Sequence, residues 1–212
     1  MKKNIIYLLL IIFSTFLNAN EKVVLQLKWF HQFQFAGYYA AKEKGFYDEV
    51  GLDVEIKQRD LKYNNIDEVI NGNAQYGVAD SILILYRLKQ QPVVIVSPIF
   101  QHSPSVFISL KKKNISSIYE LNNKDILFYP NNTDGFSLLA MIKKFDLDVN
   151  LVRERYKDDY MRLINNEVDV MPAYIANEPF LFKEKGYDVN IINPTNYGFD
   201  MYGDMLFTNE DE

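Results

Sequence analysis

Short apolar segments alternate with longer amphipathic ones along most of this chain. The short segments are rich in Val, Ile and Leu and end at Gly, Pro or Asn, which is typical of buried strands. They predict strands at residues 23–27, 52–56, 76–79, 93–96, 106–110, 126–129, 149–153, 168–173, 189–192 and 205–208. The longer segments predict helices at 36–44, 66–71, 81–89, 135–145, 158–165 and 178–185. This alternation predicts an α/β fold with mixed, mostly parallel sheets.

Two extended segments interrupt the alternation and predict two lobes with a cleft between them. We call them crossings, because each would pass from one lobe to the other. The first crossing lies near Pro98 and Pro104, and the second runs from Pro194 to Gly203. We predict a signal peptide at 1–19, a first lobe at 20–102, a second lobe at 103–194 and a return crossing at 195–212. Residues 22–212 would together form one domain.

The chain begins with the pattern of an exported protein. Lys2 and Lys3 precede an uncharged apolar run at 5–17, and Ala19 offers a small residue before a cleavage point. We therefore expect a periplasmic protein that meets the membrane only through this segment. The alternative is that the segment stays attached as a membrane anchor.

The composition excludes several classes of function. The formal net charge is −5 and there is no basic tract, which argues against a nucleic-acid partner. There is no cysteine, which excludes disulfides and thiolate metal sites. The two histidines, His31 and His102, have no partner at metal-ligand spacing, so we expect polar residues near the cleft rather than a metal site. The chain carries no phosphate-binding loop, dinucleotide fingerprint or nucleophile elbow, so we expect neither an enzyme nor a cofactor.

The turn between the first predicted strand and helix is densely aromatic. Ligands of open α/β sheets bind beyond the carboxyl ends of the strands, and flat rings there suit a flat organic ligand. We predict that Trp29 and Tyr38 face the ligand. Phe33, Phe35 and Tyr39 are predicted to be core.

Three further strand-to-helix turns carry polar residues. Asp80 and Ser81 can cap the helix that follows and also contact a ligand. At 131–135 the helix start attracts anions, unless Asp134 caps it. Glu178 lies in a first helical turn, where the helix dipole favours a carboxylate that could also accept a ligand amine. Tyr174 and Asn177 flank Glu178.

Taken together, these segments resemble the NMT1/THI5-like, or SsuA/THI5-like, group of type II periplasmic binding proteins. The resemblance covers nearly all of the chain after the leader. It rests on Trp29 with Gln34-Phe-Ala-Gly-Tyr-Tyr39, Lys44-Gly-Phe-Tyr47 with Gly51-Leu-Asp-Val54, Tyr174 with Asn177-Glu-Pro179, and Tyr202-Gly-Asp-Met-Leu-Phe207.

The resemblance implies a two-lobed fold that captures a small aromatic heterocycle for the permease of an ABC importer. A thiamine-pyrimidine precursor is the expected ligand, with Trp29 stacked on its ring and Glu178 bound to its amine. The expected ligand-binding residues are Trp29, Gln34, Tyr38, Asp80, Ser81, Asn132, Thr133, Tyr174, Asn177 and Glu178. The alternative is a sensory input domain fused to a membrane histidine kinase or diguanylate cyclase.

The chain departs from the family pattern in two respects. The fungal thiamine pyrimidine synthase of this group uses a pyridoxal-phosphate lysine, a donor histidine and a cysteine-rich run. These align by eye with Ala79, Leu83 and the region Phe199–Gly203, so that enzyme is disfavoured. Relatives also continue with helices beyond the last predicted strand. We therefore expect a truncated C-terminus that leaves Met205, Leu206 and Phe207 beside an unfinished layer, and a poorly soluble chain.

Overall fold

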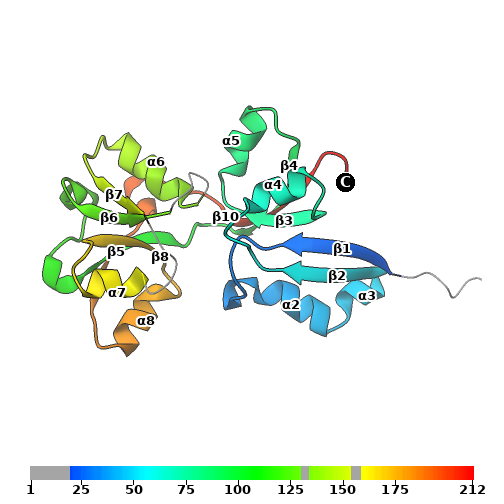
Figure 1. The fold of residues 1–212 in the computed structure, drawn as a ribbon, viewed down its shortest axis with the longest axis horizontal. Helices are drawn as coiled ribbons and strands as arrows, with labels where there is room; N and C mark the ends of the chain where they lie inside the picture. The colour runs from blue at the N-terminus through cyan, green and yellow to red at the C-terminus, as the bar shows by residue number, and fades with distance from the viewer. Residues whose placement is uncertain (1–19, 130–133, 154–158) are drawn as a thin grey trace, which may run out of the picture. The chain divides into compact units, whose positions relative to one another are not determined.

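The computed structural model describes residues 20–129, 134–153 and 159–212. These residues form two compact units, each drawn in Figure 1. The first takes in the described residues up to Val78 together with Pro92–Val94 and Phe207–Glu212. The second consists of Ala79–Gln91 and Ile95–Leu206. The predicted lobe boundaries and the cleft stay predictions.

The first sheet has five strands in the order β2-β1-β3-β10-β4. β1 runs parallel to β2 and to β3, with Val23 opposite Val54 and Leu25 opposite Tyr76. The strands are β1 (Glu21–Gln26), β2 (Leu52–Lys57), β3 (Tyr76–Ala79), β4 (Val93–Phe100) and β10 (Gly203–Asn209). The helices are η1 (Phe33–Phe35), α2 (Ala36–Glu43), α3 (Phe46–Glu49), α4 (Asn65–Ile70) and α5 (Leu83–Leu88).

The second sheet also has five strands, in the order β7-β6-β8-β5-β9. β6 is parallel to β7 and β8, whereas β5 is antiparallel to β8 and β9, which confirms the predicted mixed sheet. The strands are β5 (Ser105–Leu110), β6 (Asp125–Phe128), β7 (Asn150–Arg153), β8 (Val170–Tyr174) and β9 (Val189–Ile192). The helices are η2 (Lys111–Lys113), η3 (Ile118–Leu121), α6 (Phe136–Lys144), α7 (Asp159–Ile164), α8 (Glu178–Glu184) and η4 (Pro194–Tyr197).

Strand β5 carries the core of the second unit, since all six of its residues are buried. Side chains alternate across a strand, so successive residues feed two different cores. Phe107 joins the cluster that contains Leu138 of α6, and Ile108 joins the cluster that contains Leu163 of α7 and Phe182 of α8. In agreement, Figure 1 shows α6 on one side of this sheet and α7 with α8 on the other.

Glycines end two helices as the sequence predicts. Gly45, after α2, has φ 75°, and Gly186, after α8, has φ 80°. Only glycine adopts this left-handed conformation without a steric cost, so both positions are helix caps. Gly45 also begins the short helix α3, which the sequence analysis did not predict.

The predicted burial of several residues is wrong. Phe33 is 92% exposed, because the short turn η1 directs only Phe35, at 1% exposure, into the core. Met205 and Phe207 are buried, at 2% and 0% exposure, so these two residues do not border an unfinished layer.

Strand β4 runs four residues beyond its predicted end, through Pro98 to Phe100. It is an edge strand of its sheet, where proline is tolerated.

Candidate functional site

The aromatic turn after β1 is held by Arg59, which is 3% exposed. The Arg59 backbone N–H donates to the Trp29 carbonyl at 3.1 Å, and Arg59 Nη1 donates to the Lys28 carbonyl at 3.2 Å. Trp29 is half-buried, and its ring lies edge-on to Phe30 with the centroids 5.3 Å apart. The backbone that carries the indole is therefore fixed while part of the ring stays accessible to a ligand.

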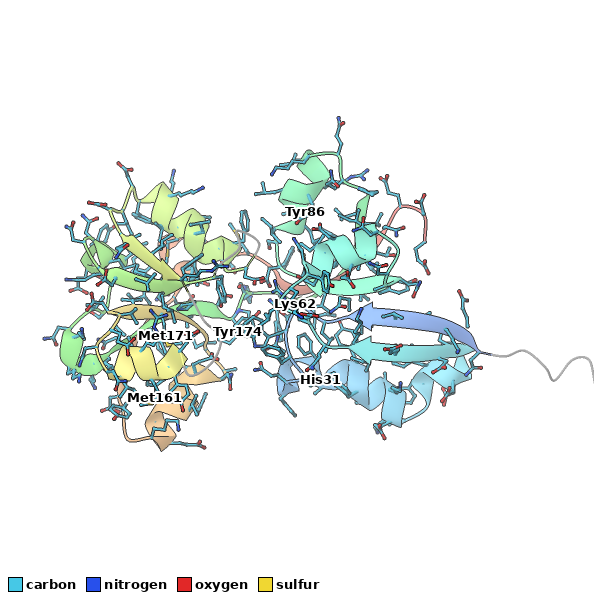
Figure 2. All side chains as sticks on the ribbon, viewed as in Figure 1. His31, Lys62, Tyr86, Met161, Met171 and Tyr174 are labelled. Carbon is cyan, nitrogen blue, oxygen red and sulfur yellow. The ribbon has the colours of Figure 1, made fainter. Side chains whose placement is uncertain are left out.

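The other predicted residues of this region lie on η1 and α2. Gln34 and Tyr38 are both half-buried. The His31 Nδ1 is hydrogen-bonded to the Tyr39 hydroxyl, and Tyr39 is half-buried rather than core. Burial raises the pKa of the Tyr39 phenol above 10.0. Figure 2 labels His31 in this segment.

A polar pocket in the first unit was not predicted from the sequence. It has an empty volume of about 320 Å³, which includes solvent at its open mouth. Buried Gln26 donates to the Leu27 carbonyl at 3.0 Å, and buried Asn65 donates to the Val78 carbonyl at 2.8 Å. The pocket is lined by Gln26, Lys57, Arg59, Asp60, Tyr63, Asn65 and Glu68. Lys57 forms an ion pair with Glu68 at 3.1 Å. Much of the polar lining therefore already bonds to other groups of the protein.

In the second unit, the structure brings one tyrosine and two aspartates together at the end of β8. Tyr174, labelled in Figure 2, donates its hydroxyl proton to Asp204 Oδ1 at 3.0 Å. The Asp204 N–H donates to Asp80 Oδ1 at 3.3 Å. Asp204 is 1% exposed, whereas Asp80 and Tyr174 are half-buried. We call Tyr174, Asp204 and Asp80 the acidic cluster.

The acidic cluster keeps the Tyr174 phenol protonated. Desolvation raises its pKa well above 10.0, and the negative charges of Asp80, Asp204 and Asp134 raise it further. A phenolate here would face three carboxylates with little water to screen them. Tyr174 is therefore a neutral hydrogen-bonding group at any physiological pH.

The Glu178 carboxylate accepts hydrogen bonds from residues of the turn between β8 and α8. Its Oε2 accepts the Tyr174 N–H at 2.6 Å, and its Oε1 accepts the Asn177 side-chain amide at 2.9 Å. Glu178 is half-buried and Asn177 is exposed. Three predicted residues of this turn are thus brought together, and the Glu178 carboxylate is oriented by the turn itself.

Burial raises the pKa of the Glu178 carboxyl above 4.5, although hydrogen bonds from the Tyr174 N–H, from its own N–H and from the Asn177 side chain lower it in part. The folded protein then retains a proton that the unfolded chain has already lost. The contribution of Glu178 to stability is therefore complete below about pH 4.5 and falls as the pH rises through the folded pKa.

Glu178→Gln removes this titrating group, so we expect the free energy of unfolding of the variant to fall less than that of the unaltered chain as the pH rises. Urea unfolding of the two proteins between about pH 4 and about pH 7 measures this difference. Stability curves that run parallel over this range would contradict the prediction.

Ser81 lies beside a small depression in the same unit. Its hydroxyl donates to the Tyr202 carbonyl at 2.6 Å. The depression has an empty volume of about 180 Å³, which is below the usual range for a ligand pocket. It is lined by Asp80, Ser81, Ser103, Phe136, Ser137, Met201 and Tyr202. This depression alone does not enclose a ligand.

The predicted helix caps differ from those observed. α5 begins at Leu83 with Ile82 as its N-cap, and among the described residues no side chain caps it. The cap predicted for Asp80 or Ser81 is therefore wrong, because these side chains bond to the return segment at 202–204 instead. Similarly, Gly135 is the N-cap of α6, and in the described chain no side chain, Asp134 included, caps that helix. The predicted site residues Asn132 and Thr133 lie outside the described residues.

The histidines have local partners. His102 Nδ1 lies 2.8 Å from the Asp200 carboxylate, and both side chains are exposed. In the part of the chain that the structure describes, no three His, Asp or Glu side chains are grouped so as to hold a metal ion. Within the same residues, no helix has the length and apolar character needed to span a bilayer.

Comparison with known families decides the classification. The model of the family described as NMT1/THI5 like matches residues 32–212, which is most of the chain. This chain belongs to the NMT1/THI5-like family. The resemblance seen in the sequence motifs is thereby confirmed.

Two curated relatives carry names that describe a ligand. The chain is 26% identical over 184 residues to the riboflavin-binding protein RibY of Chloroflexus aurantiacus, covering 81% of this chain and 51% of that protein. It is 24% identical over 197 residues to a formylaminopyrimidine-binding protein of Halalkalibacterium halodurans, covering 91% and 60% respectively. The chain thus spans between half and three-fifths of the length of these relatives.

A solved structure matches the fold. It is that of a putative sulfonate ABC transporter, periplasmic sulfonate-binding protein SsuA, from Methylobacillus flagellatus. The TM-score is 0.63 at 15% identity, over 91% of this chain and 62% of that one. The NMT1/THI5-like chain therefore has the type II periplasmic binding protein fold that the sequence predicts.

Proposed function

We propose that this NMT1/THI5-like chain is the solute-binding component of an ABC importer and that it captures a small aromatic heterocycle bearing N–H groups. A formylaminopyrimidine or another thiamine-pyrimidine precursor is the ligand we favour. The chain acts in the periplasm, exported by the leader at 1–19, and delivers its ligand to a permease. It performs no catalysis. Family membership supports the binding role.

The acidic cluster is the observation that carries the choice of ligand. Asp80 and Asp204 carry negative charge, and the Tyr174 phenol stays neutral beside them. Such a group accepts hydrogen bonds from amino groups and repels sulfonate or phosphate. The names of the two curated relatives support a nitrogen heterocycle as well. We therefore propose an aminopyrimidine over a sulfonate, even though a sulfonate-binding protein shares the fold.

A thermal-shift screen tests the ligand class. The purified chain is heated with formylaminopyrimidine, hydroxymethylpyrimidine, riboflavin, thiamine and an alkanesulfonate. A ligand at 100 times its Kd stabilises the folded state by about 2.7 kcal/mol. We expect a clear upward shift with an aminopyrimidine and none with the sulfonate. A shift with the sulfonate alone would contradict the proposal.

The sensory alternative predicts a different gene context. Permease and ATPase genes beside this one support transport. A kinase or cyclase reading frame continuous with it supports a sensory input domain.

Two single substitutions test the predicted contacts. Trp29→Ala removes the stacked ring and Glu178→Gln removes the charge that would bind an amine. We expect each to weaken pyrimidine binding by roughly 1–3 kcal/mol while the fold is kept. Phe33→Ala is the matched control, because its ring lies in the same segment but is 92% exposed.

Calorimetry measures all three variants. Unchanged affinity in both Trp29→Ala and Glu178→Gln would remove these residues from the site. Unfolding of Trp29→Ala would assign the indole to the core instead. Glutamine is used at position 178 because alanine would also remove the acceptor of the Tyr174 N–H.

A further inference from the structure

The polar pocket of the first unit is built around two buried carboxamide side chains. Gln26 ends β1 and is 2% exposed, and Asn65 begins α4 and is 4% exposed. We propose that this pocket is a binding site for a small, uncharged, planar molecule with an amino group, and that Gln26 and Asn65 accept its N–H bonds. All residues of the lining belong to the first unit, so the site goes beyond the proposed function and does not use the acidic cluster.

The hydrogen bonds of the Gln26 amide fix the direction of its oxygen. Gln26 Nε2 donates to the Leu27 carbonyl at 3.0 Å. The same atom lies 3.4 Å from the Lys57 carbonyl and 3.3 Å from the Gln58 carbonyl. Carbonyl oxygens only accept hydrogen bonds, so the nitrogen has to be the atom that faces all three. If the nitrogen and oxygen were exchanged, Oε1 would face three other acceptors.

Asn65 repeats this arrangement. Its Nδ2 donates to the Val78 carbonyl at 2.8 Å. Within the described ranges of the chain, the side-chain hydrogen bonds of Gln26 and Asn65 run through their nitrogen atoms, and the pocket is the open space that both residues line. A buried carbonyl oxygen that accepts no bond is costly, so two such oxygens on one pocket indicate a ligand with N–H donors. Solvent at the open mouth can reach these oxygens, and a ligand amino group offers the same kind of donor in a fixed place.

The charges of the lining favour an uncharged ligand. Lys57 forms its ion pair with Glu68 at 3.1 Å, and the Glu68 carboxylate also accepts the Asn73 side-chain amide at 3.2 Å. Arg59 and Asp60 add one further charge of each sign to the lining. Because these charges balance, neither a cation nor an anion gains a net attraction. A neutral amino group, with its two N–H donors, matches two neutral acceptor oxygens in such a setting.

A turn at the pocket supplies a flat surface. The Tyr63 N–H donates to the Asp60 carbonyl at 3.1 Å, and the N–H of Lys62, labelled in Figure 2, donates to Asp60 Oδ1 at 2.9 Å. These bonds form the turn without a ligand. Tyr63 lines the pocket yet is 59% exposed, so its ring can lie against a planar molecule. The empty volume of about 320 Å³ is at the lower end for ligand pockets and suits a single ring.

Nuclear magnetic resonance of the side-chain amides tests the site on the unaltered chain. The isotope-labelled chain is titrated with 2-aminopyrimidine and, as the matched probe, with pyrimidine, which has the same ring without the amino group. We expect the Gln26 and Asn65 amide signals to shift along one saturable curve with 2-aminopyrimidine, and the Kd of pyrimidine to be at least about tenfold higher. The Asn190 amide of the second unit, which bonds to the Ile115 carbonyl, is the internal control. Gln26 and Asn65 signals that stay in place, or that move equally with both probes, would overturn the inference.

Asn65→Ser removes one acceptor oxygen and is followed through the Gln26 amide signal. We expect the Kd of 2-aminopyrimidine to rise about tenfold in this variant and to change less than about twofold in Asn73→Ser. Asn73 is the matched control, since it is an exposed asparagine outside the lining. An unchanged Kd in folded Asn65→Ser would overturn the inference.

Asn65→Ser also removes the bond to the Val78 carbonyl. If this variant unfolds, the comparison of the two probes on the unaltered chain decides alone. The signals belong to named residues of the first unit, so a pyrimidine bound at the acidic cluster is not mistaken for this site. Failure of the proposed function and failure of this inference are therefore told apart.

Discussion

Phe207→Ala is expected to lower the free energy of unfolding by about 3–5 kcal/mol. Phe207 lies in β10 and is 0% exposed. Its ring fills the space above Gly77, where a Cβ added to the glycine would lie 2.6 Å from Phe207 Cε1. Removing the ring therefore leaves a cavity next to a residue that has no side chain with which to fill it.

Urea unfolding followed by circular dichroism measures this effect. Phe33→Ala serves as the control, because Phe33 is 92% exposed and should change stability by no more than about 0.5 kcal/mol. Equal effects of the two alanine substitutions would show that Phe207 does not belong to the core.

Adding a side chain at Gly77, beside the Phe207 ring, is also expected to lower the free energy of unfolding. Gly77→Ala should destabilise the chain by about 1–3 kcal/mol, because the new methyl group would overlap Phe207 and lie 2.7 Å from Val69 Cγ2. Gly77 is not among the glycines with positive φ, so the cost comes from crowding rather than from backbone strain.

A double variant tests that explanation. Phe207→Ala opens space for the methyl group at position 77, so Gly77→Ala should cost less in that background. Additive effects, measured in the same urea experiment, would show that the contact between Gly77 and Phe207 does not carry the cost.

Hydrophobic periodicity was sufficient to predict most of the strands and the α/β class of this fold. A buried strand such as β5 has few polar residues, so its apolar run and flanking breaks locate it. The extent of β4 could not be predicted, because Pro98 is tolerated only by virtue of the edge position, which sequence does not reveal. The short helix α3 was missed because Gly45 serves both as the cap of one helix and as the start of the next.

The burial and bonding of single side chains were harder to predict than the helices and strands. Phe33 and Phe35 are the same residue type two positions apart, yet only Phe35 is buried, because the turn η1 exposes its partner. Asp204 lies in a segment that the family resemblance identified. Its burial depends on bonds to Tyr174 and Asp80, which are 30 and 124 residues away in sequence. A single acid in a strand gives no sign of such partners.

Direct calorimetric titration of the purified chain with formylaminopyrimidine, beside an alkanesulfonate of similar size, tests the central claim. The account predicts saturable binding of the pyrimidine with a Kd of about 1 μM or tighter, near −8.2 kcal/mol, and no heat from the sulfonate. Tyr174→Phe should weaken the pyrimidine complex. Tight sulfonate binding, with no binding of the pyrimidine, would contradict the account.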